Sequence, residues 1–290
     1  MKLKLPVVRT RFPTSAAGIT ACMILSAALL LGGCASDKKK DSDETSNWSA
    51  QRLFVQGMHE LNSSNYSAAI KLFESLESRY PYGHYAEQAQ LEVAYAHYKN
   101  SEPASAVEAC DRFIKMHPNN PDVDYAYYLK GLSNFVADTT VFSDVAAQDP
   151  SERDTVNLKK SFDTFRELTK RYPDSRYTPD AIQRMQLLVN LLAEHEIHIA
   201  IYYYNRKSWV AAAARAEDSL QTYPQAPINE LALAVMARSY AKLGANDLSG
   251  QALNVLRLNF PNSKWLDDKQ PLQFRGSLQP PRSWWKFWAS

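Results

Sequence analysis

Residues 84–118 read HYAEQAQLEVAYAHYKNSEPASAVEACDRFIKMHP, and this stretch decides the fold. Its apolar residues recur at helical spacing in two runs, which a polar turn at Asn100 separates. The second run ends before Pro118, because proline lacks an N–H and restricts the residue that precedes it. The pattern predicts one helix over 84–99, a short turn, and a second helix over 103–116.

The same ending recurs along the chain. Four other dipeptides pair an aromatic residue with proline at the end of a helical run: Tyr80-Pro81, Tyr172-Pro173, Tyr223-Pro224 and Phe260-Pro261. Twelve residues before the five prolines, every residue is small: Ala69, Ala106, Ser161, Ala212 and Ser249. Twenty-four residues before them, four of the five are small again: Gly57, Ala94, Ala200 and Ala237. Small residues are needed where two helices cross closely, so the chain repeats one two-helix unit.

This repeat resembles the tetratricopeptide unit, a helix–turn–helix of about 34 residues. We therefore predict an all-α, tetratricopeptide-type helical solenoid over residues 49–262, with five repeats and about ten helices. The alternative is an unrelated helical bundle with scattered prolines. The predicted helices are 49–62, 66–79, 84–99, 103–116, 122–137, 156–171, 178–205, 208–222, 227–243 and 246–259. A long loop over 139–155 interrupts the third repeat, and long loops are more often functional or disordered than idle.

The N-terminus predicts export and lipid anchoring. Residues 1–33 have a basic start and an apolar run, which is typical of a signal peptide. The exit Leu31-Gly32-Gly33-Cys34 resembles the lipobox of bacterial lipoproteins, which implies a diacylglycerol and an N-acyl chain on Cys34. The alternative is a retained transmembrane helix, although the apolar run is at the lower length limit for one. The polar residues 34–48 predict a flexible tether. The residue after the cysteine is Ala35, which resembles the sorting signal of lipoproteins that reside in the outer membrane and face the periplasm.

Composition and motifs favour a binding protein over an enzyme. The formal net charge is +2 with interspersed signs, and no basic tract suggests nucleic acid. The chain has no nucleophile elbow, Walker loop or paired-carboxylate signature. His195 and His198 have the wrong spacing for a helical zinc site, so we expect no metal and no cofactor apart from the lipid. Cys110 is expected to be a small buried hydrophobe.

Several runs carry a more specific resemblance: Arg79-Tyr80-Pro81-Tyr82-Gly83, Ala94-Tyr95-Ala96-His97-Tyr98-Lys99-Asn100, Asp124-Tyr125-Ala126-Tyr127-Tyr128 and Arg171-Tyr172-Pro173-Asp174-Ser175. Over about residues 50–262 the chain resembles the BamD family of the Gram-negative β-barrel assembly (BAM) machinery. The resemblance implies a non-enzymatic adaptor at the outer membrane. Its implied partners are the periplasmic repeats of BamA, other BAM lipoproteins and unfolded β-barrel proteins. A tetratricopeptide lipoprotein that serves cell-wall or division machinery is the alternative function.

Two groups of residues are candidates for partner binding. Tyrosines of the first two repeats are candidates for a groove that grips aromatic-ended substrate signals: Tyr66, Tyr82, Tyr85 and Tyr98. The alternative for each is ordinary repeat packing. Around the start of the predicted helix 208–222, Arg215, Arg206 and Trp209 are candidates for partner binding. The family resemblance implies that Arg215 is the best single candidate for contact with BamA. The alternative for Arg215 is a solvated face or an internal pair with Glu217 or Asp218.

Residues 263–290 are expected to leave the repeats as a C-terminal tail. It ends in an aromatic cluster, Trp284-Trp285-Lys286-Phe287-Trp288. As a free segment the cluster would expose a costly apolar patch. Insertion at a membrane interface, docking on a partner and folding back onto the last repeat all remain open.

Overall fold

The computed structural model describes residues 45–139 and 155–273, and within these ranges every regular element is helical. The elements are α2 (Ala50–Asn62), α3 (Tyr66–Arg79), α4 (His84–Lys99), α5 (Pro103–Met116), α6 (Val123–Thr139), α8 (Val156–Arg171), α9 (Thr178–Asn205), α10 (Trp209–Thr222), α11 (Asn229–Lys242), α12 (Asn246–Asn259) and the short 3₁₀ helix η2 (Lys264–Leu266). In these two ranges the predicted all-α fold with about ten helices is confirmed, and each helix boundary lies within two residues of its prediction. The largest shifts, of two residues, are at the end of α6 and at the start of α11. Before α11 the chain forms a turn in which the Asn229 N–H donates to the Ala226 carbonyl (3.1 Å).

The chain divides into two units, residues 1–48 and 49–290. In the first unit the structure describes residues 45–48, which form a turn closed by a hydrogen bond from the Trp48 N–H to the Thr45 carbonyl (2.9 Å). The predicted signal peptide and most of the predicted tether, with Cys34, lie outside the described residues. So do most of the 139–155 loop and the end of the C-terminal tail.

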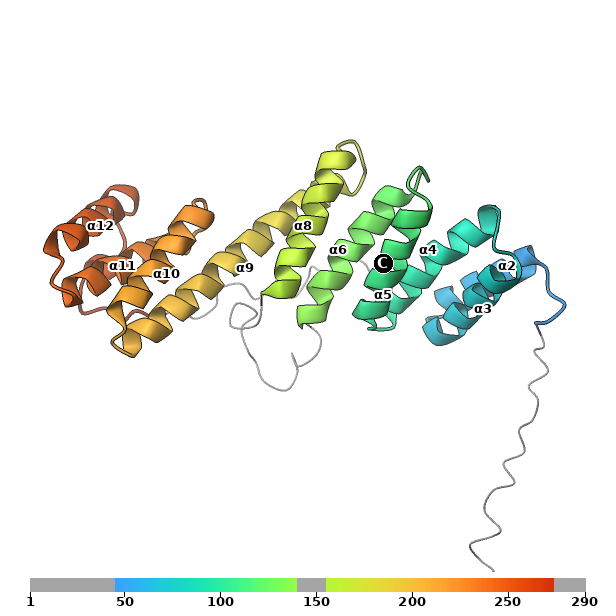
Figure 1. The fold of residues 1–290 in the computed structure, drawn as a ribbon, viewed down its shortest axis with the longest axis horizontal. Helices are drawn as coiled ribbons and strands as arrows, with labels where there is room; N and C mark the ends of the chain where they lie inside the picture. The colour runs from blue at the N-terminus through green and yellow to red at the C-terminus, as the bar shows by residue number, and fades with distance from the viewer. Residues whose placement is uncertain (1–44, 140–154, 274–290) are drawn as a thin grey trace, which may run out of the picture. The chain divides into compact units, whose positions relative to one another are not determined.

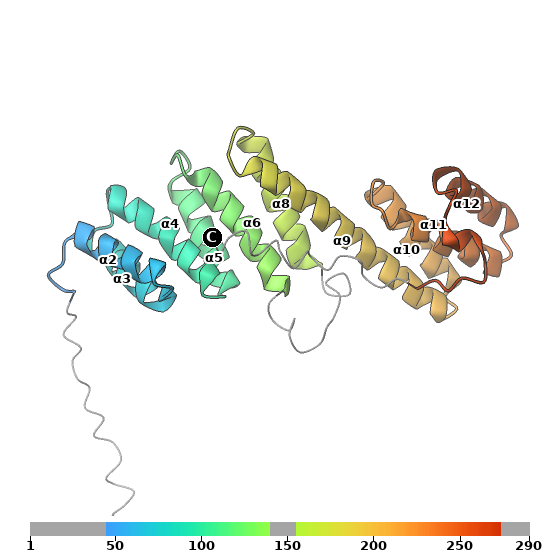
Figure 2. The same ribbon diagram turned by 180° about the vertical axis from the view of Figure 1, so that it is seen from behind.

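In the second unit each helix packs against its neighbours in the chain (Figures 1 and 2). First helices of successive repeats also contact one another, as α2 does with α4, α4 with α6, and α9 with α11. A single helix pair cannot bury its apolar face alone, so stacking of neighbours produces a continuous core. No helix in the described part of the chain is both long and apolar enough to cross a bilayer.

The small residues lie at the helix crossings, as predicted. All five positions twelve residues before the prolines are buried: Ala69, Ala106, Ser161, Ala212 and Ser249. Cys110 is fully buried as well, which confirms its expected role, and this burial raises the pKa of its thiol.

Two glycines have a matched role in the first and third repeats. A Cβ added at Gly57 would lie 2.5 Å from the Phe73 ring, and one added at Gly131 would lie 2.4 Å from the Phe165 ring. Both phenylalanines are fully buried. Gly131 is therefore the small residue of the third repeat that corresponds to Gly57. The inserted loop increases its distance from Pro173, so it does not lie twenty-four residues before that proline.

The crowding at Gly131 makes a testable prediction. We expect Gly131→Ala to lower the free energy of unfolding by about 1–2 kcal/mol, because overpacking outweighs the higher helix propensity of alanine. The matched control is Gly250→Ala in α12, where nothing lies within 4 Å of the added Cβ. This control should raise stability by about 0.5–1 kcal/mol. Urea unfolding followed by circular dichroism measures both, and a Gly131→Ala protein as stable as the parent would contradict the packing argument.

The long helix α9 joins two parts of the core. Its middle residues Leu188, Leu191 and Leu192 belong to a cluster with α5, α6 and α8. The next turns, with Ala193, Ile197 and Ala200, belong to a cluster with α10, α11 and α12. One continuous helix therefore packs into both apolar clusters.

Candidate functional site

A cavity of about 460 Å³ lies where the first helices of the second, third and fourth repeats meet. Its wall is dominated by tyrosines from α4, α6 and the turn before α9: Tyr95, Tyr98, Tyr125, Tyr128 and Tyr177. We call it the tyrosine cavity. Lys99, Arg176 and Asp180 add charged groups to its lining.

Ring stacking and hydrogen bonds hold the aromatic side chains of the tyrosine cavity in place. Tyr128 and Tyr177 stack with ring centres 4.8 Å apart and an angle of 19° between their planes. The Tyr128 hydroxyl donates to Oδ2 of Asp180 at 2.6 Å, and Nε of Arg184 donates to the same oxygen at 2.5 Å. The Tyr125 ring lies 5.3 Å from that of Tyr177. Packed and hydrogen-bonded side chains of this kind hold a fixed shape, which lowers the entropic cost of binding.

The lining of the tyrosine cavity contains uncharged tyrosine hydroxyls and two basic side chains. Burial raises the pKa of Tyr125 and Tyr128, so both hydroxyls stay protonated at neutral pH. Arg176 is exposed, with its guanidinium 4.7 Å from the centre of the Tyr177 ring, and it donates to the Tyr177 hydroxyl. Lys99 is the second basic group of the lining.

One acid near the tyrosine cavity titrates close to neutral pH. Burial, followed by the charge of Asp122, raises the pKa of Glu92 to about 6. Its charge in turn contributes to the raised pKa of Tyr125. At pH 7 Glu92 is therefore mostly ionised, and its negative charge is lost as the pH falls below 6. An aromatic side chain suits the wall of this cavity, and a carboxylate can pair with Lys99 and Arg176, the basic groups of a lining that also contains Asp180.

The four tyrosines predicted for substrate binding lie in two places. Tyr98 lines the tyrosine cavity, and Tyr66 lies close enough to Tyr95 to affect its pKa. Tyr85 is in the first turn of α4, and its ring packs 5.5 Å from that of Phe54. Because thirteen residues of helix separate Tyr85 from Tyr98, the two are about 20 Å apart. Tyr82 is 91% exposed in the turn before α4.

Sequence reasoning did not select the residues that complete the cavity. Tyr125 and Tyr128 stand at i, i+3 spacing on α6, which places them on one face. Arg176 and Tyr177 precede α9. The i, i+3 tyrosine pairs on α4 and α6 were the available signal, whereas nothing in the sequence shows that the turn before α9 meets them.

The three residues predicted for partner binding lie at the junction of α9 and α10 and in the first half of α10. Arg206 follows α9, with its guanidinium 4.7 Å from the Tyr202 ring centre. Trp209 begins α10 and packs edge-on against Tyr204 at 4.9 Å. Arg215 lies six residues further along α10, about 9 Å along the axis and on a different face from Trp209.

Arg215 is partly engaged within the chain. Its Nη1 donates to Oε2 of Glu196 on α9 at 2.9 Å, so it pairs with an acid of the preceding helix and not with Glu217 or Asp218 of its own. The Arg215 side chain remains 43% exposed, whereas that of Glu196 is 16% exposed. The ion pair therefore orients a guanidinium that still has an accessible edge.

The described residues offer no group of three or more His, Cys, Asp or Glu side chains suited to a metal ion.

Comparison with known proteins gives the family. A model of the YfiO family, described as an outer membrane lipoprotein, matches residues 46–256. The outer membrane protein assembly factor BamD of Neisseria meningitidis serogroup B is 40% identical over 92% of this chain and 98% of its own length. BamD of Xylella fastidiosa strain Temecula1 is 37% identical over 86% of this chain and 84% of its own. BamD of Vibrio cholerae is 33% identical over 81% and 96%. The chain belongs to the BamD (YfiO) family of outer membrane lipoproteins, which are assembly factors for outer membrane proteins and not enzymes.

Proposed function

We propose that this chain is a lipid-anchored adaptor on the periplasmic face of the outer membrane. In this proposal it binds the periplasmic repeats of BamA, with other BAM lipoproteins nearby, and receives unfolded β-barrel proteins for insertion. Acyl chains on Cys34 hold it at the membrane. Confinement to that surface raises the effective concentration of partners that share it.

The observation that carries the substrate part of the proposal is the tyrosine cavity. Unfolded barrel chains are rich in aromatic residues, and the proposed signal is a segment that ends in an aromatic residue. The ring of such a residue enters against Tyr125 and Tyr177, while its terminal carboxylate meets Lys99 and Arg176. Only a few residues are bound, so the rest of the chain remains unfolded for transfer to the barrel.

The junction of α9 and α10 supports the BamA part of the proposal. Arginine and tryptophan are enriched among the residues that dominate interface energies, and this junction presents Arg206, Trp209 and Arg215. The long helix α9 packs into the cluster below the tyrosine cavity and into the cluster at this junction. The helix α9 therefore contributes to both proposed partner sites, through Asp180 at its start and through the residues before Arg206 at its end.

The cavity is tested by charge reversal at its basic groups. In the mature full-length protein in detergent, the double variant Lys99→Glu/Arg176→Glu should bind a fluorescent peptide with a C-terminal phenylalanine at least tenfold more weakly, a loss of about 1.4 kcal/mol or more. The matched control is Lys115→Glu, which reverses an exposed charge on α5. Amidation of the peptide's carboxyl group should weaken binding to the parent protein and have little effect on the double variant. Unchanged affinity in the double variant would show that the peptide binds elsewhere.

A further inference from the structure

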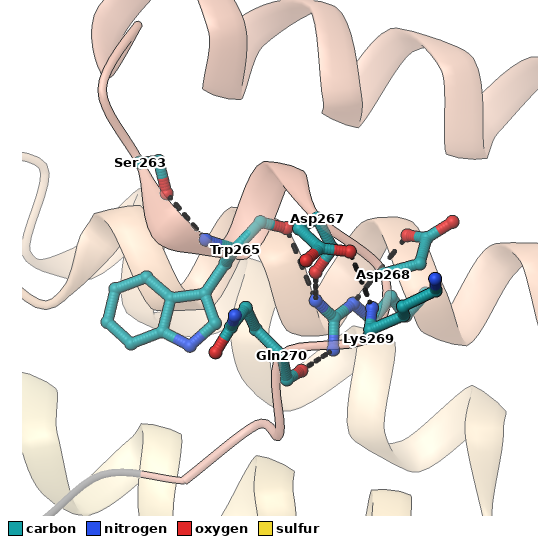
Figure 3. A network of polar contacts seen from close by, with 7 residues as sticks. Ser263, Trp265, Asp267, Asp268, Lys269 and Gln270 are labelled. Carbon is teal, nitrogen blue, oxygen red and sulfur yellow. Dashed lines mark hydrogen bonds and ion pairs between the residues drawn. The ribbon is translucent and has the colours of Figure 1, made fainter.

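The last described residues are fixed to the end of the solenoid by one arginine. After α12 the chain runs back over α11 as the C-terminal strap (residues 264–273). Arg238 on α11 donates to three backbone carbonyls of this strap, those of Gln270 (2.5 Å), Asp267 (2.8 Å) and Trp265 (3.3 Å). Figure 3 shows the strap residues of this network, with the hydrogen bonds as dashed lines. Leu272 is buried in the apolar cluster of the last repeats, so the strap is also held near its end.

The strap forms one wall of a cavity of about 520 Å³, which we call the strap pocket. Trp265 and Gln270 line this pocket from the strap. Glu194 lines it from α9, and Glu230 lines it from the first turn of α11. Because Arg238 fixes the strap, this wall has a defined shape before a ligand binds, which lowers the entropic cost of binding.

Acidic side chains outnumber basic ones in the strap pocket. Its charged residues are Glu194, Glu230 and Lys264. The Nζ atom of Lys264 lies 4.4 Å from the centre of the Trp265 ring, and within the described residues this lysine pairs with neither glutamate. No hydrogen bond or ion pair from the described residues engages the partly exposed Glu230 side chain. Glu194 is 5% exposed, so the pocket has one accessible carboxyl group and a second acid deeper inside.

The other walls of the strap pocket suit a long side chain with a flat, charged end. Pro227, Ile228 and Pro271 are apolar, and the indole ring of Trp265 already holds a cation of its own chain. Arginine combines an apolar stem with a planar guanidinium, which binds a carboxylate through two parallel hydrogen bonds and stacks on aromatic rings. The ammonium of lysine is a point charge and is more strongly hydrated, so it suits this lining less well.

We propose that the strap pocket binds an arginine side chain on an extended segment of a partner protein. The guanidinium pairs with the Glu230 carboxylate, and the stem of the side chain packs against Pro227 and Pro271. The side-chain amide of Gln270 hydrogen-bonds to the backbone of the same segment. Charge complementarity selects this occupant, because an acidic or neutral segment would leave Glu230 without a partner.

The strap pocket adds a third attachment point to the two partner sites proposed above. It shares no lining residue with the tyrosine cavity, and none of Arg206, Trp209 and Arg215 lines it. A partner held here by one arginine therefore leaves both other sites open.

Binding of a short peptide tests the proposal in the mature full-length protein in detergent. The probe is acetyl-Gly-Ser-Arg-Ser-Gly-amide, and the control peptide carries citrulline, which has the shape of arginine without its charge. The protein is labelled with nitrogen-15 tryptophan, and the variant Trp265→Phe identifies the indole N–H signal of Trp265 in the magnetic resonance spectrum. We expect the arginine peptide to shift this signal saturably, and the citrulline peptide to shift it much less.

The substitution Glu230→Gln should weaken binding of the arginine peptide about tenfold, because a charge-assisted hydrogen bond is lost. Glu230 is partly exposed, so we expect the variant to fold, which circular dichroism checks. The matched control is Glu217→Gln, which removes an exposed acid of α10 outside the pocket and should bind like the parent. The double variant Lys99→Glu/Arg176→Glu should also bind like the parent, which separates this test from that of the tyrosine cavity.

Three results would overturn the proposal. The first is the absence of a saturable shift of the Trp265 signal, or equal shifts with the arginine and citrulline peptides. The second is unchanged affinity in Glu230→Gln. The third is binding that appears only after Arg275 and Arg282 are replaced by serine, since the chain itself would then be the occupant of the pocket.

Discussion

Replacing Cys34 by alanine is expected to remove this protein from the outer membrane. The thiol is the proposed acceptor of the diacylglycerol, and without it the precursor should be neither acylated nor cleaved. Each buried CH₂ contributes about 0.8 kcal/mol, and a single myristoyl chain gives only marginal binding, so stable anchoring requires several chains. Membrane fractionation and mass spectrometry of the N-terminus measure the effect.

The matched control for that experiment is Cys110→Ala. Cys110 is fully buried at a helix crossing, so its loss leaves a small cavity but does not touch the lipid site. We expect the control to be cleaved, acylated and recovered in the outer membrane. A Cys34→Ala protein with normal acylation at another residue would disprove the assignment of the lipid site.

Arg215→Glu is expected to give the second large effect, on the affinity for the periplasmic repeats of BamA. If Arg215 is a central interface residue, its reversal costs about 2 kcal/mol or more, roughly a thirtyfold loss of affinity. Binding of purified BamA repeats to the mature protein, followed by isothermal titration calorimetry, measures this loss. The control Arg166→Glu reverses another exposed arginine that pairs with an acid of its own chain, Asp163.

A charge swap separates partner binding from internal structure. Arg215→Glu/Glu196→Arg restores the ion pair between α9 and α10 with its charges exchanged. If Arg215 contacts BamA directly, the swapped protein is folded but still binds weakly. Recovery of full affinity in the swapped protein would show that the pair acts only by holding the two helices together.

The helices could be predicted from the sequence because the same residue types recur at equivalent positions of each repeat. The prolines end the second helices, and the small residues mark crossings that the structure buries, as at Ala69 and Ala212. The third repeat was harder, since the inserted loop moved Gly131 out of register with Gly57. The contact with Phe165 shows that Gly131 is the small residue at this helix crossing. The two residues are far apart in the sequence because the inserted loop lies between them.

The candidate site could be predicted only in part. Tyr98 is in the tyrosine cavity, but Tyr82 and Tyr85 lie at the other end of α4, because one-dimensional richness in tyrosine does not specify which end of a helix faces a neighbour. Arg238 was not predicted either. It binds backbone carbonyls, which every residue has, so its partners leave no pattern in the sequence.

The central claim is that this protein works within the barrel-assembly machinery of the outer membrane. The most direct measurement is isolation of the full-length, lipidated protein from detergent-solubilised membranes, with every co-purifying protein identified and quantified by mass spectrometry. The account predicts recovery of a large β-barrel protein with periplasmic repeats, BamA, in amounts comparable to the isolated protein. Recovery of cell-wall or division factors without BamA would contradict it.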